Sequence, residues 1–186
     1  MAPRNEVEDV WTYPRPPALQ RTPKYVFFPS PHTRVLRLRV IWIATDGAET
    51  VLADTTEGYR VLETTHPPTY YLPPGALKVS LQKTSKSSFC EWKGQASYHT
   101  LQPPLSTIPI QNRIWSYPAP TGSFSPIKDH LSFYASTGID KKKLGGEWVC
   151  FVDDERVGLQ EGDFYGGWVT SNLKGRMKGG PGTWGW

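Results

Sequence analysis

Prolines and glycines divide this sequence into short segments, and that division limits the folds the chain can adopt. The 186 residues include 18 prolines and 17 glycines. Proline fixes the backbone and removes an amide donor, while glycine favours turns and close backbone approaches. No stretch of about twelve residues keeps the apolar periodicity of an α-helix. We therefore expect an all-β protein of short antiparallel strands, folded as a compact roll or tent-like domain.

The clearest predicted strand is Val35–Ile43, where apolar residues alternate with arginines. Asp46 and Gly47 are typical of a hairpin turn after it. Both faces of Glu147–Val152 are apolar, so we expect this segment in the centre of a sheet. Further strands are predicted at Glu49–Asp54, Tyr59–Thr65, Thr69–Leu72, Lys78–Lys83, Ser88–Glu91, Gln95–Leu101, Arg113–Tyr117, His130–Ala135 and Arg156–Gln160.

The chain divides into a proline-rich N-terminal arm, residues 1–34, and a single all-β domain, residues 35–186. Prolines favour an extended arm. Its aromatic residues, among them Trp11 and Tyr13, indicate that it lies along the surface of the domain.

Charge and cysteine content exclude several classes of protein. With 21 basic and 17 acidic residues the net charge is only +4, so we expect no nucleic-acid partner. Cys90 and Cys150 are too far apart for a zinc finger, so two buried thiols are favoured over a disulfide. We find neither a signal peptide nor an apolar run of about 20 residues. We therefore expect a soluble, cytoplasmic protein without a membrane partner, and we predict no metal or other cofactor.

Residues suited to chemistry occur first in the segment Arg60–Tyr71. Alternation places Glu63 beside apolar neighbours, and a buried carboxylate needs a partner. The prolines that follow His66 hold its backbone extended and position its ring. The alternative is that Glu63 pairs with an arginine and His66 caps a turn.

A second segment, Cys90–Tyr98, carries a cysteine and a lysine near aromatic residues. Alternation separates Cys90 and Trp92 from Lys93. Lys93 precedes a glycine and is suited to bind an anion as a compact point charge. Cys90 has no histidine or run of cations beside it in the sequence, so a structural thiol is favoured over a nucleophile.

Two further segments combine aromatic residues with turns. Trp115 and Tyr117 share one face of a strand and are expected to pack in the core, or else to form one wall of a pocket. In Gln160–Thr170 and Lys178–Trp186, glycines beside large aromatic residues would let the backbone approach a ring or a ligand closely. Neither segment has the signature of a phosphate-binding loop.

In these segments the chain resembles the family called domain of unknown function 427 (DUF427). The resemblance rests on RVLETTHPPTYY, CEWKGQASY, WSYP, QEGDFYGGWVT and KGGPGTWGW, in that order. It implies an all-β roll or tent-like fold, and the proline-rich arm resembles the fungal single-domain form. Relatives often carry proline where this chain has Glu91 and Glu161. The family is sometimes labelled a nucleotidyltransferase-type domain, but this sequence has no Asp-x-Asp, and Asp153-Asp154-Glu155 is predicted in a hairpin turn.

Three interpretations of the function remain open, and the oligomeric state is also open. In the first, an aromatic-lined pocket binds a small polar or flat ligand through Arg60, Tyr70, Trp92, Tyr98, Trp115, Tyr117, Tyr165 and Trp168. In the second, the protein is an enzyme in which Glu63 or Asp163 is the general base, His66 an acid-base group and Lys93 an oxyanion stabiliser. In the third, these segments specify only turns and packing. The first two require the side chains to converge within one cleft.

Overall fold

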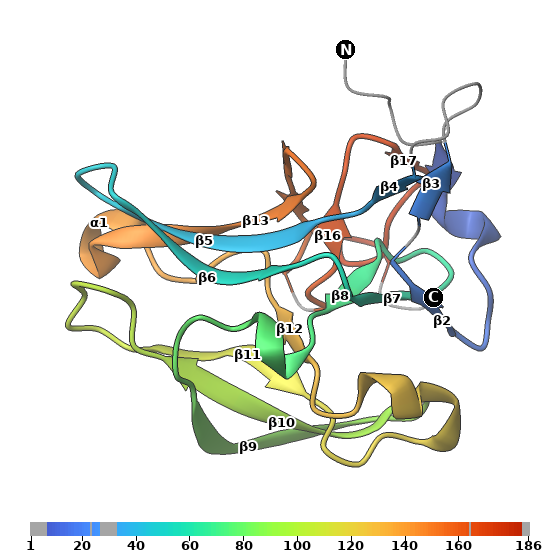
Figure 1. Ribbon diagram of the computed structural model, residues 1–186. Coiled ribbons are helices and arrows are strands. Elements are labelled where there is room, and N and C mark those ends of the chain that lie inside the picture. Colours follow the sequence, from blue (N-terminus) through green and yellow to red (C-terminus); the bar gives the residue numbers. More distant parts are fainter. Residues whose placement is uncertain (1–6, 23, 27–32, 164, 184–186) are drawn as a thin grey trace.

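Two four-stranded antiparallel sheets form the two main layers of the protein, with the larger part of the core between them (Figure 1). The computed structural model describes residues 7–22, 24–26, 33–163 and 165–183. Parts of the predicted arm and the last residues of the glycine-rich C-terminal segment lie outside these ranges. Strands predominate and the helices are short, so the prediction of a single all-β domain is confirmed.

The first sheet has the order β14-β13-β5-β6. Its strands are β5 (Leu38–Ala44), β6 (Glu49–Thr55), β13 (Gly146–Val152) and β14 (Glu155–Arg156). β13 pairs with β5 along its whole length and with β14 on its other edge, which confirms the predicted central position. Gly47 has a φ of 87° in the turn between β5 and β6, a conformation that glycine adopts without strain.

The second sheet has the order β12-β11-β10-β9. Its strands are β9 (Gln82–Cys90), β10 (Gly94–Leu101), β11 (Ile110–Ser116) and β12 (Leu131–Phe133). The two strands predicted at Lys78–Lys83 and Ser88–Glu91 are wrong as separate elements, because β9 runs unbroken from Gln82 to Cys90. β9 is the edge strand and most of its residues are exposed, so it lacks the alternation that would have identified it.

A third, smaller sheet connects these layers. Its strands are β2 (Ala18–Arg21), β7 (Tyr59–Leu62) and β8 (Thr69–Tyr71), in the order β2-β7-β8. Just after β8, Leu72 and Leu131 exchange two backbone hydrogen bonds of 2.8 Å, which join this sheet to β12. Because side chains alternate along β8, Tyr70 packs in the core between the main sheets, while Tyr71 packs in a separate group of buried residues, the second aromatic cluster. The buried members of this cluster are Val61, Tyr71, Ala96, Tyr98, Trp115, Tyr117, Phe124 and Ile127.

Short elements complete the fold. They are β1 (Glu8–Asp9), β3 (Lys24–Val26), β4 (Thr33–Val35), β15 (Gly158–Leu159), β16 (Trp168–Val169), β17 (Leu173–Lys174), the 3-10 helices η1 (Val10–Thr12), η2 (Pro74–Ala76) and η3 (Gly122–Ile127), and the α-helix α1 (Lys141–Leu144). None of the helices in the described part of the chain has the length and apolar character needed to cross a bilayer.

The described part of the N-terminal segment is held by the rest of the protein. β1 pairs in parallel with β17, and β2 pairs with β7. Val10 and Tyr13 are buried. Arg60 donates to Glu8 Oε1 at 2.8 Å and to Gln20 Oε1 at 2.7 Å, so this arginine fastens two parts of the segment to β7.

Candidate functional site

A cavity of about 650 Å³ opens beside the second aromatic cluster. Its walls come from β7, β8 and the loop that joins them, from β9 to β11, and from the loop that precedes β16. Volumes of this order are typical of sites that bind small molecules.

Most of the residues predicted from the sequence as site residues line this one cavity. The four predicted acid-base or anion-binding residues do so: Glu63, His66, Lys93 and Asp163. Five of the predicted ligand-binding aromatic residues do so as well: Trp92, Tyr98, Trp115, Tyr117 and Tyr165. Segments far apart in the sequence therefore meet at one place.

Three predicted ligand-binding residues do not line the cavity. Tyr70 packs against Trp168, with ring centroids 5.1 Å apart, in the core between the main sheets. The indole of Trp168 donates to the carbonyl of Phe133 at 2.8 Å. Arg60 is engaged with the N-terminal segment. Core packing therefore explains Tyr70 and Trp168, and hydrogen bonds to the N-terminal segment explain Arg60.

Lys93 enters the cavity because a turn interrupts the alternation predicted for its segment. Residues 91–93 form the turn between β9 and β10, and Gly94 follows with a φ of 93°. Lys93 therefore lines the same cavity as Trp92, although alternation had predicted opposite faces. Its side chain is buried, with the ammonium 5.9 Å from the ring centre of Tyr117.

The surroundings of Lys93 favour its protonated form over the neutral amine. Burial alone would lower the pKa of Lys93, but interactions with its ionisable neighbours, Tyr71 first, then Cys90 and Glu63, leave the pKa above the ordinary value. Lys93 is therefore protonated at neutral pH.

Cys90 lies beside this ammonium as a free, half-buried thiol. It lines the same cavity as Lys93 and Tyr117. The second cysteine, Cys150, is free and fully buried, so the predicted buried thiol is confirmed there, while Cys90 is only partly enclosed.

Tyr71 is a lining residue that the sequence analysis did not select. Its side chain has no exposed surface, and within the described part of the chain its hydroxyl has no hydrogen-bond partner. Burial raises the pKa of Tyr71 above the ordinary value, so the hydroxyl keeps its proton. Tyr70 and Tyr71 are neighbours in one strand, and alternation could have shown that only one of them faces the main core.

His66 is held in a fixed orientation. Its Nδ1 lies 3.0 Å from the carbonyl oxygen of Thr64, and its ring meets Tyr165 edge-on with centroids 4.7 Å apart. Burial lowers the pKa of His66 below the ordinary value. The negative charge of Glu63 opposes this shift, and the positive charges of Lys178 and Lys93 add to it. In the neutral ring Nδ1–H donates to the carbonyl, which leaves Nε2 unprotonated.

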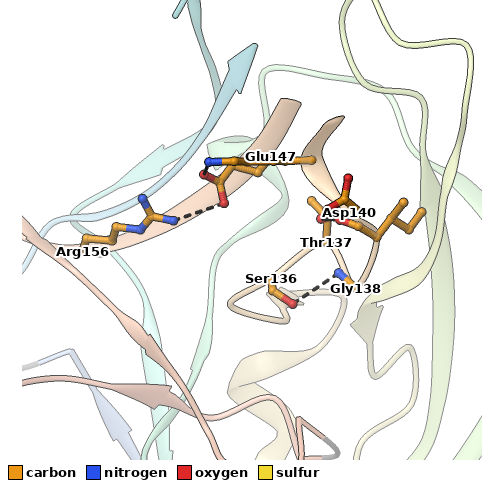
Figure 2. A pocket seen from close by; sticks show the side chains of 8 residues that line it. Ser136, Thr137, Gly138, Asp140, Glu147 and Arg156 are labelled. Carbon is orange, nitrogen blue, oxygen red and sulfur yellow. Dashed lines mark hydrogen bonds and ion pairs between the residues drawn. The ribbon is translucent and has the colours of Figure 1, made fainter. Parts of the chain in front are cut away.

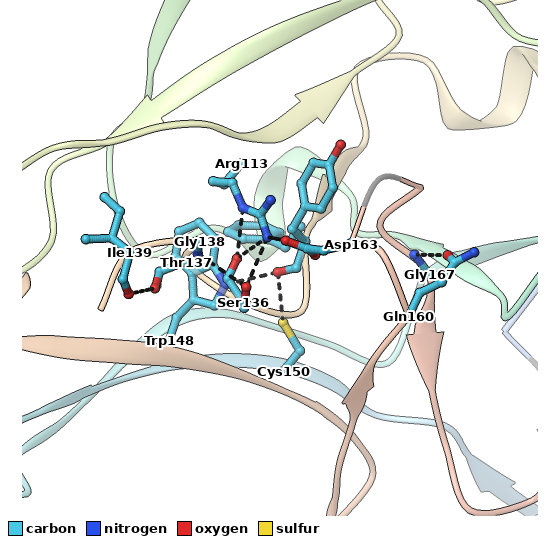
Figure 3. Close-up of polar contacts among 12 residues, drawn as sticks. Arg113, Ser136, Thr137, Gly138, Ile139, Trp148, Cys150, Gln160, Asp163 and Gly167 are labelled. Carbon is cyan, nitrogen blue, oxygen red and sulfur yellow. Dashed lines mark hydrogen bonds and ion pairs between the residues drawn. The ribbon is translucent and has the colours of Figure 1, made fainter. Parts of the chain in front are cut away.

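Arg113 is a second lining residue that the sequence analysis did not select (Figure 3). Its guanidinium donates to Asp163 Oδ2 at 2.7 Å and to the carbonyl of Ser136 at 2.8 and 3.0 Å. It also lies 4.0 Å from the ring centre of Tyr134. Arg113 is two residues before Trp115 in the same strand, so period-two alternation could have identified it.

The wall behind Arg113 is anchored from the core side. The carbonyl of Tyr134 accepts a hydrogen bond of 3.0 Å from the Trp148 indole and one of 3.8 Å from the Cys150 thiol. Burial raises the pKa of Tyr134 to about 12. The ring of Tyr134 is thus fixed against Trp115, with centroids 4.9 Å apart.

A second, shallower hollow of about 600 Å³ lies near α1 (Figure 2). Glu147 there pairs with Arg156 at 3.2 Å and with Lys141 at 3.9 Å. Asp140 accepts hydrogen bonds from the first amides of α1. Its charged groups thus have partners within the fold, so the larger cavity is the better candidate.

Acidic residues are dispersed in the described part of the chain. No group of three or more His, Cys, Asp or Glu residues there is placed to hold a metal ion. The predicted hairpin turn at Asp153 and Asp154 is confirmed, between β13 and β14. Asp153 accepts from the Arg37 amide at 2.9 Å, and Asp154 pairs with Arg39 at 3.2 Å.

Comparison with known families gives one match. The model described as Domain of unknown function (DUF427) matches residues 31–145, more than half of the chain. The matched region includes Glu63, His66 and Lys93, whereas Asp163 and Tyr165 lie beyond it. Comparison with curated proteins gives no significant match.

Proposed function

The chain belongs to the DUF427 family, and we propose that its cavity binds a small, flat and polar ligand between aromatic walls. One observation carries the proposal: aromatic and polar side chains from widely separated parts of the chain line a single cavity of about 650 Å³. Sites for small molecules are concave, mostly apolar and furnished with a few placed polar groups.

The aromatic walls favour a flat ligand. Trp115 is held between Tyr71 and Tyr134, with T-shaped contacts to both rings. Trp92 is half-buried in the turn between β9 and β10. Rings fixed in this way offer apolar faces and edges to a planar group at little cost in side-chain entropy.

The polar groups favour a ligand with hydrogen-bonding atoms. Lys93 supplies an ammonium, Tyr71 a hydroxyl and His66 an unprotonated ring nitrogen, all on side chains that line the cavity. These groups are buried, so they are costly to leave unpaired and would discriminate strongly between ligands.

Catalysis is the second candidate function, and it is favoured by the joint presence of Glu63, His66 and Lys93 at one cavity. Lowering of its pKa keeps His66 neutral and able to act as a base. Asp163 is less suited to that role, because its carboxylate is occupied by Arg113. The purely structural interpretation applies to Arg60, Tyr70 and Trp168.

Thermal unfolding in the presence of nucleotides, sugars, amines and planar aromatic compounds tests the proposal. A ligand at about 100 times its Kd adds about 2.7 kcal/mol of stability. For a domain of this size that corresponds to a rise in Tm of roughly 5–10 °C.

A matched pair of variants locates the binding. Trp92→Ala removes an aromatic wall and should weaken binding by about threefold or more. Trp11→Ala removes a half-exposed tryptophan outside the cavity and should leave binding unchanged. Equal losses in the two variants, or no shift with any compound, would contradict the proposal.

A further inference from the structure

We propose that Lys93 and Tyr71 form a carboxylate subsite at the buried end of the cavity, so that the ligand is a flat aromatic or heteroaromatic monocarboxylate. This inference rests on the proposed function and specifies the ligand class. It depends on two buried groups in the described part of the chain: the Tyr71 hydroxyl, which has no hydrogen-bond partner there, and the Lys93 ammonium, which has no carboxylate within 4.0 Å there.

The first donor is the hydroxyl of Tyr71. The side chain has no exposed surface and lines the cavity, and its oxygen has no hydrogen-bond partner among the residues that the structure describes. A buried hydroxyl normally has an acceptor, because leaving it unpaired costs folding free energy. An acceptor atom of a bound ligand would satisfy it.

The second donor is the ammonium of Lys93, whose side chain is only 9% exposed. An ammonium carries three donors, and this one lies 5.9 Å from the ring centre of Tyr117 and 5.8 Å from that of Phe124. In the described part of the chain no carboxylate lies within 4.0 Å of it, and the charge of Glu63 acts from a greater distance. A buried cation without an adjacent anion is costly, and an anionic ligand group would remove that cost.

The two donors belong to one local cluster. Tyr71 and Lys93 line the same cavity. Tyr117 neighbours both residues. Its ring centroid lies 6.3 Å from the ring centroid of Tyr71 and 5.9 Å from the ammonium nitrogen of Lys93. One carboxylate can accept from both donors at once, because its two oxygens offer four lone pairs.

The charge of the lining favours a single negative charge on the ligand. The lining side chains include four cations and three carboxylates, which leaves an excess of one positive charge: Lys86, Lys93, Arg113 and Lys178 against Glu63, Glu91 and Asp163. Arg113 is already paired with Asp163. The charge of Glu63, which is felt at Lys93, would repel a dianionic phosphate more than a carboxylate.

Isothermal titration calorimetry of the full chain with three matched probes tests the subsite. 2-Naphthoate, 2-naphthamide and 2-naphthyl phosphate share one ring system and differ in the polar group. We expect 2-naphthoate to bind about tenfold or more tightly than the amide and the phosphate, because a charge-assisted hydrogen bond is stronger than a neutral one.

Variants assign the effect to the two donors. Lys93→Met should weaken binding of 2-naphthoate by about tenfold or more and change amide binding little, whereas exposed Lys143→Met changes neither. Tyr71→Phe should weaken 2-naphthoate by about threefold or more and leave the unfolding midpoint unchanged or higher, because the lost hydroxyl had no partner. Tyr13→Phe, a buried tyrosine outside the cavity that donates to Glu8, should leave binding unchanged.

The outcomes separate this inference from the proposed function. If the amide or the phosphate binds as tightly as 2-naphthoate, or if Lys93→Met weakens acid and amide equally, the carboxylate subsite is overturned and the proposed function stands. If none of the three probes binds, the carboxylate subsite is overturned, and the proposed function is then decided by thermal unfolding with the wider set of compounds. Should Lys93→Met not fold, an unchanged preference for acid over amide in Tyr71→Phe would also overturn the subsite.

Discussion

Arg113 Nη2 and Asp163 Oδ2 lie 2.7 Å apart, and this ion pair joins strand β11 to the loop before β16 at the wall of the cavity. The two residues are 50 positions apart in the sequence. The same guanidinium holds the carbonyl of Ser136, so one side chain fixes three segments (Figure 3).

Replacing Arg113 by lysine should therefore loosen this wall. Lysine keeps the charge but cannot form the forked hydrogen bonds, so we expect the free energy of unfolding to fall by about 1–2 kcal/mol. Arg156→Lys, at an exposed pair with Glu147, should cost less than about 0.5 kcal/mol. Urea denaturation measures both changes, and equal costs would contradict the role assigned to Arg113.

The pair of Arg60 and Glu8 should stabilise the N-terminal segment. Arg60 is 7% exposed, so neutralising Glu8 leaves a buried cation without the negative charge of this partner. We expect Glu8→Gln to lower the free energy of unfolding by about 1–3 kcal/mol. Lys174→Met, at the exposed pair with Asp9, should cost at most about 1 kcal/mol. Chemical denaturation gives both values, and a neutral Glu8→Gln would refute this role.

Gly167 should not tolerate a side chain. A Cβ there would lie 2.5 Å from Pro67 Cγ and 2.7 Å from Gln160 Oε1, in the contact between the C-terminal loop and the loop of His66. We expect Gly167→Ala to destabilise the protein by about 1–3 kcal/mol. Gly75→Ala, where a Cβ meets nothing within 4 Å, is the matched control. Equal Tm values for the two variants would contradict the prediction, because they would show that the neighbours of Gly167 move to accommodate the added methyl group.

Stability should fall as the pH drops below the ordinary histidine pKa of 6.5, because His66 has a lowered pKa in the folded protein. In that range the unfolded chain binds more protons than the folded one, so acid favours unfolding. His66→Asn should reduce this pH dependence without abolishing it, since burial also lowers the pKa of His99. Urea denaturation between pH 5 and 8 measures the slope, and an unchanged slope in His66→Asn would contradict the assignment.

The sequence predicted the class of fold because alternation and turn residues are local signals. Val40 and Trp42 are buried as their alternation predicted, and the hairpin at Gly47 is present. The edge strand β9 was divided in two because both of its faces are largely exposed, which removes the apolar pattern.

The site was harder to predict, since it depends on pairing between distant strands. Alternation assigned Lys93 to the opposite face from Trp92. That assignment is wrong, because both residues lie in a turn, where alternation does not apply. Tyr71 was not selected, because the absence of a partner for its hydroxyl becomes visible only when the surrounding chain is in place. Alternation with Trp115 could have placed Arg113 at the cavity, but no local pattern predicts its bonds to Asp163 and Ser136.

The most direct test of the proposed ligand-binding cavity follows the indole N–H signals of the tryptophans by NMR during titration with 2-naphthoate. Trp92 and Trp115 line the cavity, whereas Trp42, Trp148 and Trp168 lie in the main core. We predict that the signals of Trp92 and Trp115 shift along one saturating curve and that the core tryptophans respond little. Unchanged signals from Trp92 and Trp115, or a response centred on exposed Trp11, would contradict binding in this cavity.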